Sequence, residues 1–252
     1  MDRESCVFCN DDATVERSPN RFEMELNLES ICAQVDQARA ALKSDQSLFA
    51  PNYWKAPELS SQGSATQAEV FYAVGAALSA WEGVESALAT LYVILCDGET
   101  GPYKALARTF GSITSSGSRR GAIKAAAEIY FGQYWTVPKV KKRLTRMLDS
   151  IGDASQRRDE IAHGQAYGVT IDNKSYGCFL FASEYSSSRN HAFPQVNSGD
   201  PLSFSTAKYR YSAVDILEFE LKFNALREAV WQYLISIKKI NGTPGEMVIA
   251  LT

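Results

Sequence analysis

Apolar residues recur at alternating three- and four-residue steps through two long segments of the chain. Residues 65–96 carry the stripe Phe71, Val74, Leu78, Trp81, Leu88, Tyr92 and Leu95. Residues 213–239 carry the stripe Ile216, Phe219, Phe223, Leu226, Val230, Tyr233 and Ile237. This spacing places each stripe along one face of a helix. The pattern therefore predicts two long helices that pack lengthwise in a bundle.

Three shorter helices are predicted between the long ones, over residues 102–110, 119–130 and 138–164. The glycine- and serine-rich residues 111–118 are typical of a loop. Pro138 suits the first turn of the third helix, where its missing amide hydrogen would be unpaired in any residue. Gly164 suits the C-terminal cap of that helix, and Gly152 is expected to kink or break it.

The hydrophobic period changes after Tyr167. Apolar and aromatic residues flank the polar residues 172–175, which predicts a β-hairpin, and residues 202–211 are expected to add a third strand. Ser212 and Asp215 have the spacing of a capping box at the start of the last helix. The fold class predicted is mainly α: an antiparallel helical bundle with a small antiparallel β insertion at about 166–211.

The chain before this bundle has a different character. Residues 1–20 are polar and are expected to form a flexible tail, 21–63 an N-terminal helix (22–45) and linker, and 64–242 the helical domain. Cys6 and Cys9 have the spacing of half a zinc site, but no second pair follows them. A metal site and two plain thiols both remain open; we favour the thiols, and no metal or cofactor is expected.

Charge is distributed unevenly along the chain. The net charge is −3, yet residues 101–158 hold twelve Lys or Arg against three acidic residues, a surplus of nine that leaves −12 elsewhere. Basic patches bind phosphate backbones, which makes RNA the expected partner. The alternative is a solvated helix face paired with the acidic flanks. The residues predicted to bind nucleic acid are Arg119, Arg120, Lys139, Lys141, Lys142, Arg143 and Arg146.

Two features bear on location. No apolar run approaches the roughly 18–20 residues that span a bilayer, and the polar N-terminus is unlike a secretory signal. Five cysteines in such a chain do not indicate a disulfide framework. We therefore expect a cytoplasmic protein without membrane contact.

The most informative stretch is 157–164, with the sequence Arg-Arg-Asp-Glu-Ile-Ala-His-Gly. It contains His163, one of two histidines in the chain, and Asp159 lies one helical turn before it. A histidine that transfers a proton and an arginine that stabilises phosphate charge suit phosphodiester cleavage. The alternative is that His163 caps helix carbonyls while the arginines form ordinary ion pairs.

The spacing from Arg158 to His163, closed by Ala-His-Gly, resembles the R-x(4–6)-H signature of HEPN domains (higher eukaryotes and prokaryotes nucleotide-binding). The long helix before the motif, with Trp81, Glu82 and Glu85, and the long helix after it extend the resemblance to about residues 65–240. The resemblance implies a ribonuclease that assembles its site in a homodimer. A toxin or defence effector would fit such an activity.

If the protein acts on RNA, such a site would need no metal. The ribose 2′-hydroxyl would attack the adjacent phosphorus, with His163 as general base or acid and Arg158 stabilising the phosphorane. Asp159 would orient His163 or hold the arginine, and Glu85 would fix Arg157 or Arg158 from the neighbouring helix. The alternative function is a non-catalytic HEPN-like module that binds a nucleotide, nucleic acid or protein partner.

Overall fold

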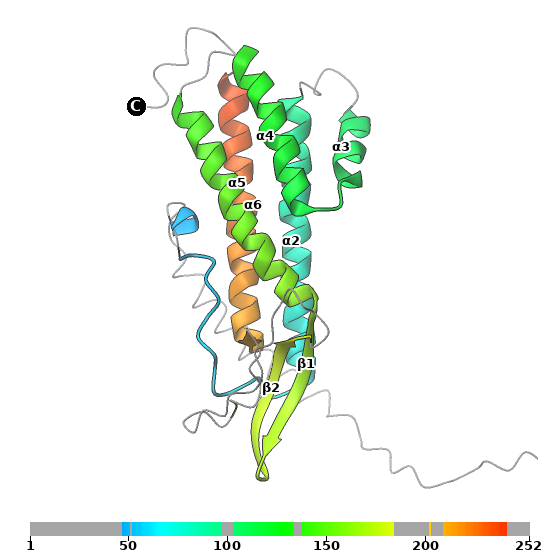
Figure 1. The fold of residues 1–252 in the computed structure, drawn as a ribbon, viewed down its shortest axis with the longest axis vertical. Helices are drawn as coiled ribbons and strands as arrows, with labels where there is room; N and C mark the ends of the chain where they lie inside the picture. The colour runs from blue at the N-terminus through cyan, green and yellow to red at the C-terminus, as the bar shows by residue number, and fades with distance from the viewer. Residues whose placement is uncertain are drawn as a thin grey trace, which may run out of the picture.

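The computed structural model describes residues 47–50, 52–96, 103–133, 138–183, 202 and 209–240. Over these residues the protein is mainly helical, and a small antiparallel sheet lies at one end of a helical bundle (Figure 1). The bundle consists of α2 (Gln67–Leu95), α4 (Ser116–Gln133), α5 (Pro138–Ala162) and α6 (Ala213–Ile240). The predicted tail, the predicted helix over 22–45, Cys6 and Cys9 lie outside the described residues.

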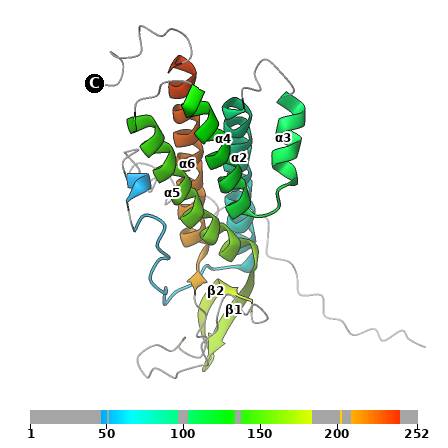
Figure 2. The same cartoon turned by 45° about the horizontal axis from the view of Figure 1, so that its top comes forward.

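Two short elements lie on the outside of this bundle. The helix α3 (Tyr103–Ser112) packs beside α2, on the side away from α6 (Figure 2). The 3-10 helix η1 (Ser47–Phe49) packs on α5 and α6. Ser150 of α5 fixes it, because its hydroxyl donates to the Leu48 carbonyl at 2.9 Å and accepts from the Trp54 indole at 2.7 Å.

The pair α2 and α6 forms the centre of the core. Every position of the predicted α6 stripe is buried, so that prediction is confirmed. The α2 stripe is right at Trp81, Leu88 and Leu95 but wrong at Phe71, which is 58% exposed. Small side chains explain the error, because α2 turns a row of alanines inward (Ala73, Ala77, Ala80 and Ala87) and thereby lets its neighbours approach closely.

Helix ends follow from side-chain caps. The predicted capping box is present at α6, where the Ser212 amide donates to Asp215 Oδ2 at 2.8 Å and the Asp215 amide to Ser212 Oγ at 3.3 Å. Most of the predicted loop 111–118 is helical instead. The Ser118 amide donates to Ser115 Oγ at 3.0 Å, which starts α4 three residues earlier than predicted.

Gly152 does not interrupt α5. The helix runs unbroken from Pro138 to Ala162, so the expected break is absent. The Arg120 guanidinium crosses α5 at Gly152 and donates to the Leu148 carbonyl at 3.3 Å. A Cβ at position 152 would overlap this guanidinium, so a larger residue there would require the flexible Arg120 side chain to shift.

The predicted hairpin is confirmed as β1 (Gly164–Ile171) and β2 (Lys174–Ala182), followed in the sheet by the two-residue β3 (Arg210–Tyr211). Asp172 and Asn173 form its turn with φ of 50° and 60°. Two positive φ values at the central positions are the mark of a type I′ turn, which matches strand twist. The hairpin has its own small core, formed by Val169, Phe179, Phe181 and Leu202.

The segment before α2 fastens the hairpin to the bundle. Ser64 pairs with Cys178 of β2 through two backbone hydrogen bonds of 2.7 and 2.8 Å. Gly177 lies against this pairing with φ of +87°, and a Cβ there would come within 2.7 Å of the Ser64 carbonyl oxygen. Both its backbone conformation and its surroundings therefore require glycine.

By length and composition, α2 alone among the described helices is apolar enough to cross a membrane, but 56% of its most apolar window is buried inside the structure. Packing against the other helices accounts for that apolar content.

We expect Gly177→Ala to lower the free energy of unfolding by about 2–3 kcal/mol, because it combines backbone strain with a clash against backbone atoms. The matched control is Gly121→Ala in α4, where a Cβ meets nothing within 4 Å. That change should raise stability by up to about 1 kcal/mol through helix propensity. Urea unfolding measures both changes in stability. Equal effects of the two substitutions would contradict the conclusion that position 177 requires glycine.

Candidate active site at the C-terminal end of α5

Helix α5 carries the motif to the junction between bundle and sheet. The helix ends at Ala162, His163 closes the last turn by donating its amide to the Asp159 carbonyl at 3.1 Å, and β1 begins at Gly164. The His163 side chain is exposed. Gly164, predicted to cap α5, lies directly after the last turn, but its φ is not positive, and a Cβ there would overlap the Leu180 side chain.

The two arginines of the motif point in different directions. Arg157 is only 7% exposed, and its Nη1 lies 3.0 Å from Glu160 Oε2 and 3.3 Å from the Tyr211 hydroxyl. Tyr211 donates to the same Glu160 oxygen at 2.6 Å, and Tyr209 donates to the Glu160 carbonyl at 2.8 Å. Arg157, predicted to be catalytic, therefore lies in a buried cluster that joins α5 to β3.

Burial determines the ionisation of this cluster. The pKa of Tyr211 is raised, first because burial disfavours the phenolate and second because the Glu160 carboxylate lies beside it. The phenol therefore stays protonated, which is the form that donates to Glu160. The hydroxyl thus adds one hydrogen bond to each member of a charge pair in the interior.

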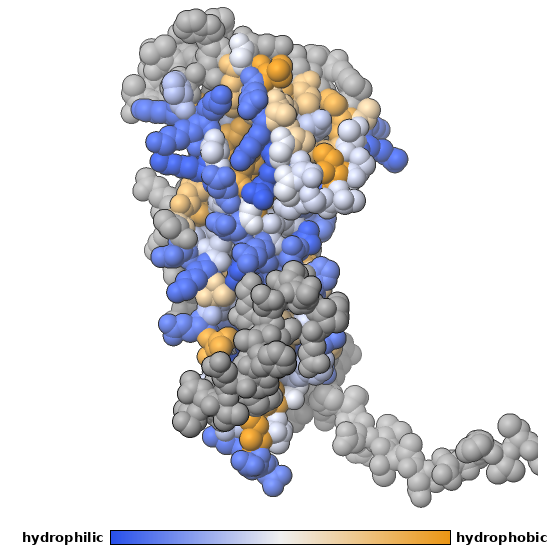
Figure 3. Space-filling view, in the orientation of Figure 1, coloured by the Kyte–Doolittle hydropathy of each residue, from blue (hydrophilic) through white to orange (hydrophobic). Residues whose placement is uncertain are grey.

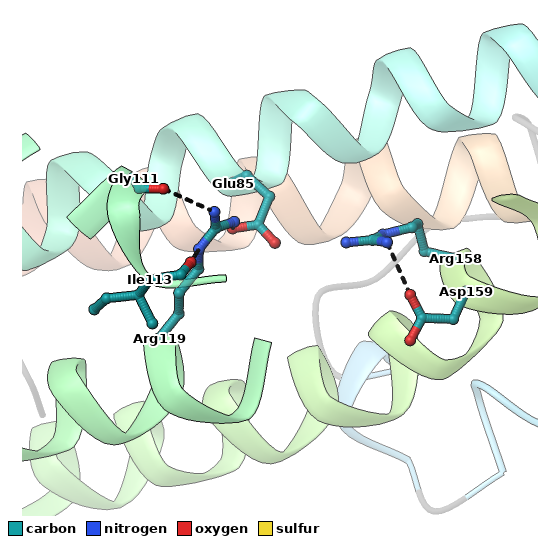
Figure 4. Close-up of polar contacts among 6 residues, drawn as sticks. All are labelled: Glu85, Gly111, Ile113, Arg119, Arg158 and Asp159. Atoms are coloured by element: carbon teal, nitrogen blue, oxygen red, sulfur yellow. Dashed lines mark hydrogen bonds and ion pairs between the residues drawn. The ribbon is translucent and has the colours of Figure 1, made fainter. Parts of the chain in front are cut away.

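Arg158 is held at the edge of the bundle. Its Nη1 lies 2.8 Å from Asp159 Oδ1, and its Cζ lies over the Trp81 ring at 5.6 Å from the centroid, within cation–π range. The side chain stays 28% exposed. Of the two predicted roles for Asp159, the structure shows the second: its carboxylate holds the arginine (Figure 4).

Glu85 is buried and pairs with an arginine, but the predicted partner is wrong. Its Oε2 lies 2.7 Å from Nη1 of Arg119 on α4, and not against Arg157 or Arg158. Arg119 also donates to the Ile113 carbonyl at 2.7 Å. Figure 4 shows Arg119 and Arg158 on opposite sides of Glu85 along α2. The earlier start of α4 brings Arg119 to this position.

The predicted nucleic-acid-binding residues fall into two groups. Arg119 and Arg120 are packed between helices, which leaves them little access to a phosphate backbone. The cations of α5 lie on the surface, where Figure 3 shows hydrophilic side chains gathered over the start of that helix. Exposed on α5 are Lys139, Lys141, Lys142 and Arg146, and Arg143 is half-buried.

Within the described residues, no cluster of three His, Cys, Asp or Glu side chains is placed to hold a metal ion. The described cysteines, Cys96 and Cys178, are free thiols. Trp81 contacts Arg158, which the sequence pattern did not predict, although the pattern placed Trp81 in the core and in the helix that extends the resemblance. Its spacing from Glu85 by one turn was visible, but no sequence signal pairs it with Arg158.

No protein-family model, curated protein or solved structure matches this chain. The likeness to HEPN domains therefore rests on residues 157–164 and on the order of the helices around them.

Tyr211→Phe should lower the free energy of unfolding by about 1–3 kcal/mol at neutral pH, because Arg157 and Glu160 lose a buried hydrogen-bond partner. Because the folded pKa of Tyr211 is raised, the stability from its protonated form is present below about pH 10 and is lost as pH rises further. The variant should therefore lose less stability than the unmodified protein between about pH 9 and 11. Urea unfolding across this pH range measures the stability of both proteins. Parallel curves of stability against pH would contradict the role given to the Tyr211 hydroxyl.

Arg119→Met should destabilise the fold by about 2 kcal/mol, because Glu85 would remain buried without its cation. The control is Arg108→Met, which removes an exposed arginine of α3. The double variant Arg119→Met with Glu85→Gln should recover part of the loss. Thermal and urea unfolding measure all four proteins. A loss no greater than that of the control would show that Arg119 is not structural.

Proposed function

We propose that this protein is a metal-independent endoribonuclease of the HEPN type, with Arg158 and His163 as its catalytic pair. One observation carries the proposal: a guanidinium held in place yet partly exposed stands five residues before an exposed histidine. Over that interval a helix rises about 7.5 Å and turns by about 140° beyond one full turn, so the two side chains would contact one phosphate by reaching around the end of α5 or across a homodimer. A toxin or defence effector would make use of such an activity.

The reaction divides between the two groups. His163 would take the proton from the ribose 2′-hydroxyl or give one to the leaving 5′-oxygen, and Arg158 would stabilise the charge on the pentacoordinate phosphorus. The products would be a 2′,3′-cyclic phosphate and a 5′-hydroxyl. Asp159 and Trp81 support this role for Arg158, because they restrict its side chain before substrate binds.

A homodimer would complete the site. The cleavage requires both a proton acceptor and a proton donor, and one copy of His163 performs one of these at a time. Exposed aromatic side chains support pairing: Phe71 and Tyr72 on α2 and Tyr167 on β1 are each about half exposed. These elements adjoin, because the Gln67 side chain donates to the Ala166 carbonyl at 2.7 Å. A second copy packed here would bring its own His163 nearby.

A non-catalytic RNA-binding module is the second candidate. The observation that favours it is the set of exposed lysines on α5, which bind phosphates without any need for His163. Such a module would bind RNA equally well with or without the histidine, and would release no cyclic phosphate.

The test is cleavage of labelled total RNA in the presence of EDTA. We expect His163→Ala to lower kcat by about 100- to 10,000-fold, and Arg158→Ala by about 100-fold or more. The controls are His191→Ala, the other histidine of the chain, and Arg108→Ala on α3. Thermal unfolding establishes that each variant is folded.

Cleavage that survives EDTA, ends in a cyclic phosphate and disappears in both motif variants would support the ribonuclease. RNA binding without cleavage by the unmodified protein would favour the binding module. Equal cleavage by all variants would mean that the activity belongs to a contaminant, and the motif assignment would fail.

A further inference from the structure

We propose that the exposed cations at the start of α5 form a second RNA site, separate from the site of cleavage, which holds a single strand several nucleotides away from the scissile bond. This α5 cation cluster comprises Lys139, Lys141, Lys142 and Arg146. The inference rests on the proposed ribonuclease function and specifies its substrate: single-stranded RNA long enough to reach both sites.

The cluster is available for an external anion. None of its four side chains forms an ion pair with a residue that the structure describes, and all four are exposed. Lys139, Lys142 and Arg146 are three and four residues apart, so they lie along one side of the helix. These three charges therefore form one surface directed at solvent, and Lys141 lies about 100° around the helix from Lys142.

The position of the cluster on the helix strengthens its attraction for anions. The first turn of α5 contains no acidic residue and begins a run of lysines. Helix N-termini carry partial positive charge, which makes cations there unfavourable by about 0.3–1 kcal/mol each. A bound phosphate would relieve both the repulsion among the lysines and their conflict with the helix dipole. Local conflicts of this kind are typical of functional surfaces.

Helix α5 sets the distance between the two sites. Twelve residues separate Arg146 from Arg158, and twenty-four separate Lys139 from His163, which correspond to about 18 and 36 Å of helix rise. The helix is continuous from Pro138 to Ala162. One rigid element therefore carries both sites, and only a strand of several nucleotides reaches from one to the other.

The interval between the sites is acidic, which favours a single strand over a duplex. Asp149 and Asp153 are exposed there, and the Asp149 side chain is 63% accessible despite its 3.8 Å contact with Lys124. A rigid duplex that lay on both sites would bring evenly spaced phosphates past these carboxylates. A flexible single strand can bend away from the interval and still contact both ends.

The experiment compares single strands of one sequence composition and increasing length, from about 3 to 16 nucleotides. The variant is Lys142→Glu with Arg146→Glu in the full chain, and the control is Lys104→Glu with Arg108→Glu, the same charge change on exposed positions of α3. Cleavage gives KM and kcat. Binding is measured by fluorescence anisotropy on the His163→Ala background at two salt concentrations.

For the longest strands, we expect the α5 variant to raise KM about tenfold or more and to flatten the salt dependence of binding, with kcat unchanged. For the shortest strands the α5 variant should behave like the unmodified protein. The α3 control should match the unmodified protein at every strand length. The milder Lys142→Gln with Arg146→Gln should give an intermediate loss on long strands. A duplex of the same length should bind more weakly than the single strand.

Three results would overturn the inference: equal losses on short and long strands, no loss on long strands, or an equal loss in the α3 control. Loss of binding to an acidic peptide with RNA binding intact would assign the cluster to a protein partner instead. If the unmodified protein cleaves nothing, the anisotropy series still shows whether the α5 cation cluster binds RNA. Failure of the ribonuclease proposal is therefore distinguishable from failure of this one.

Discussion

The buried pairing of Arg157 with Glu160 is the constraint that fixes the end of α5. Both side chains are almost fully enclosed, and Tyr211 from β3 donates into the pair. Because an unpaired charge in this position would be strongly unfavourable, the last turns of the helix have one rotational setting relative to the sheet. With Arg157 turned inward, the neighbouring residue is rotated by about 100° to the bundle edge, since a helix has 3.6 residues per turn. Arg158 owes its position over Trp81 to that rotation.

Periodicity predicted the elements that follow one regular pattern. The α6 stripe, the hairpin and the capping box at Ser212 all correspond to short-range rules, and each is present. The errors lie where the local sequence permits more than one structure and tertiary packing determines which one forms. Alanines on α2 shifted its buried face away from Phe71, and the Ser115 cap lengthened α4. At Gly152 the sequence cannot show that an arginine from another helix crosses α5.

The candidate site shows the same division between local and tertiary information. The run 157–164 identified the end of α5, and Glu85 is buried beside an arginine other than the predicted ones. Ile151, Ala154 and Ile161 follow a helical apolar stripe whose next inward position falls at residue 157 or 158. The spacing therefore indicates that one of the two arginines is interior, but it does not say whether this is Arg157 or Arg158. The partners Arg119 for Glu85 and Tyr211 for Glu160 lie 34 and 51 residues away, beyond any local pattern.

The direct passage from α5 into β1 has a consequence for how this site can work. His163 is the single residue between a helix and a strand, so its backbone has no loop to move with. Residues on loops can be carried into place when a ligand arrives, whereas the His163 backbone is fixed by two elements at once. If His163 acts in the proposed reaction, adjustment would come from rotation of its imidazole, from the bound strand, or from the approach of a second subunit. The geometry of such a site is fixed when the chain folds. Its selectivity would then depend on which ligands can adopt a shape that fits this geometry.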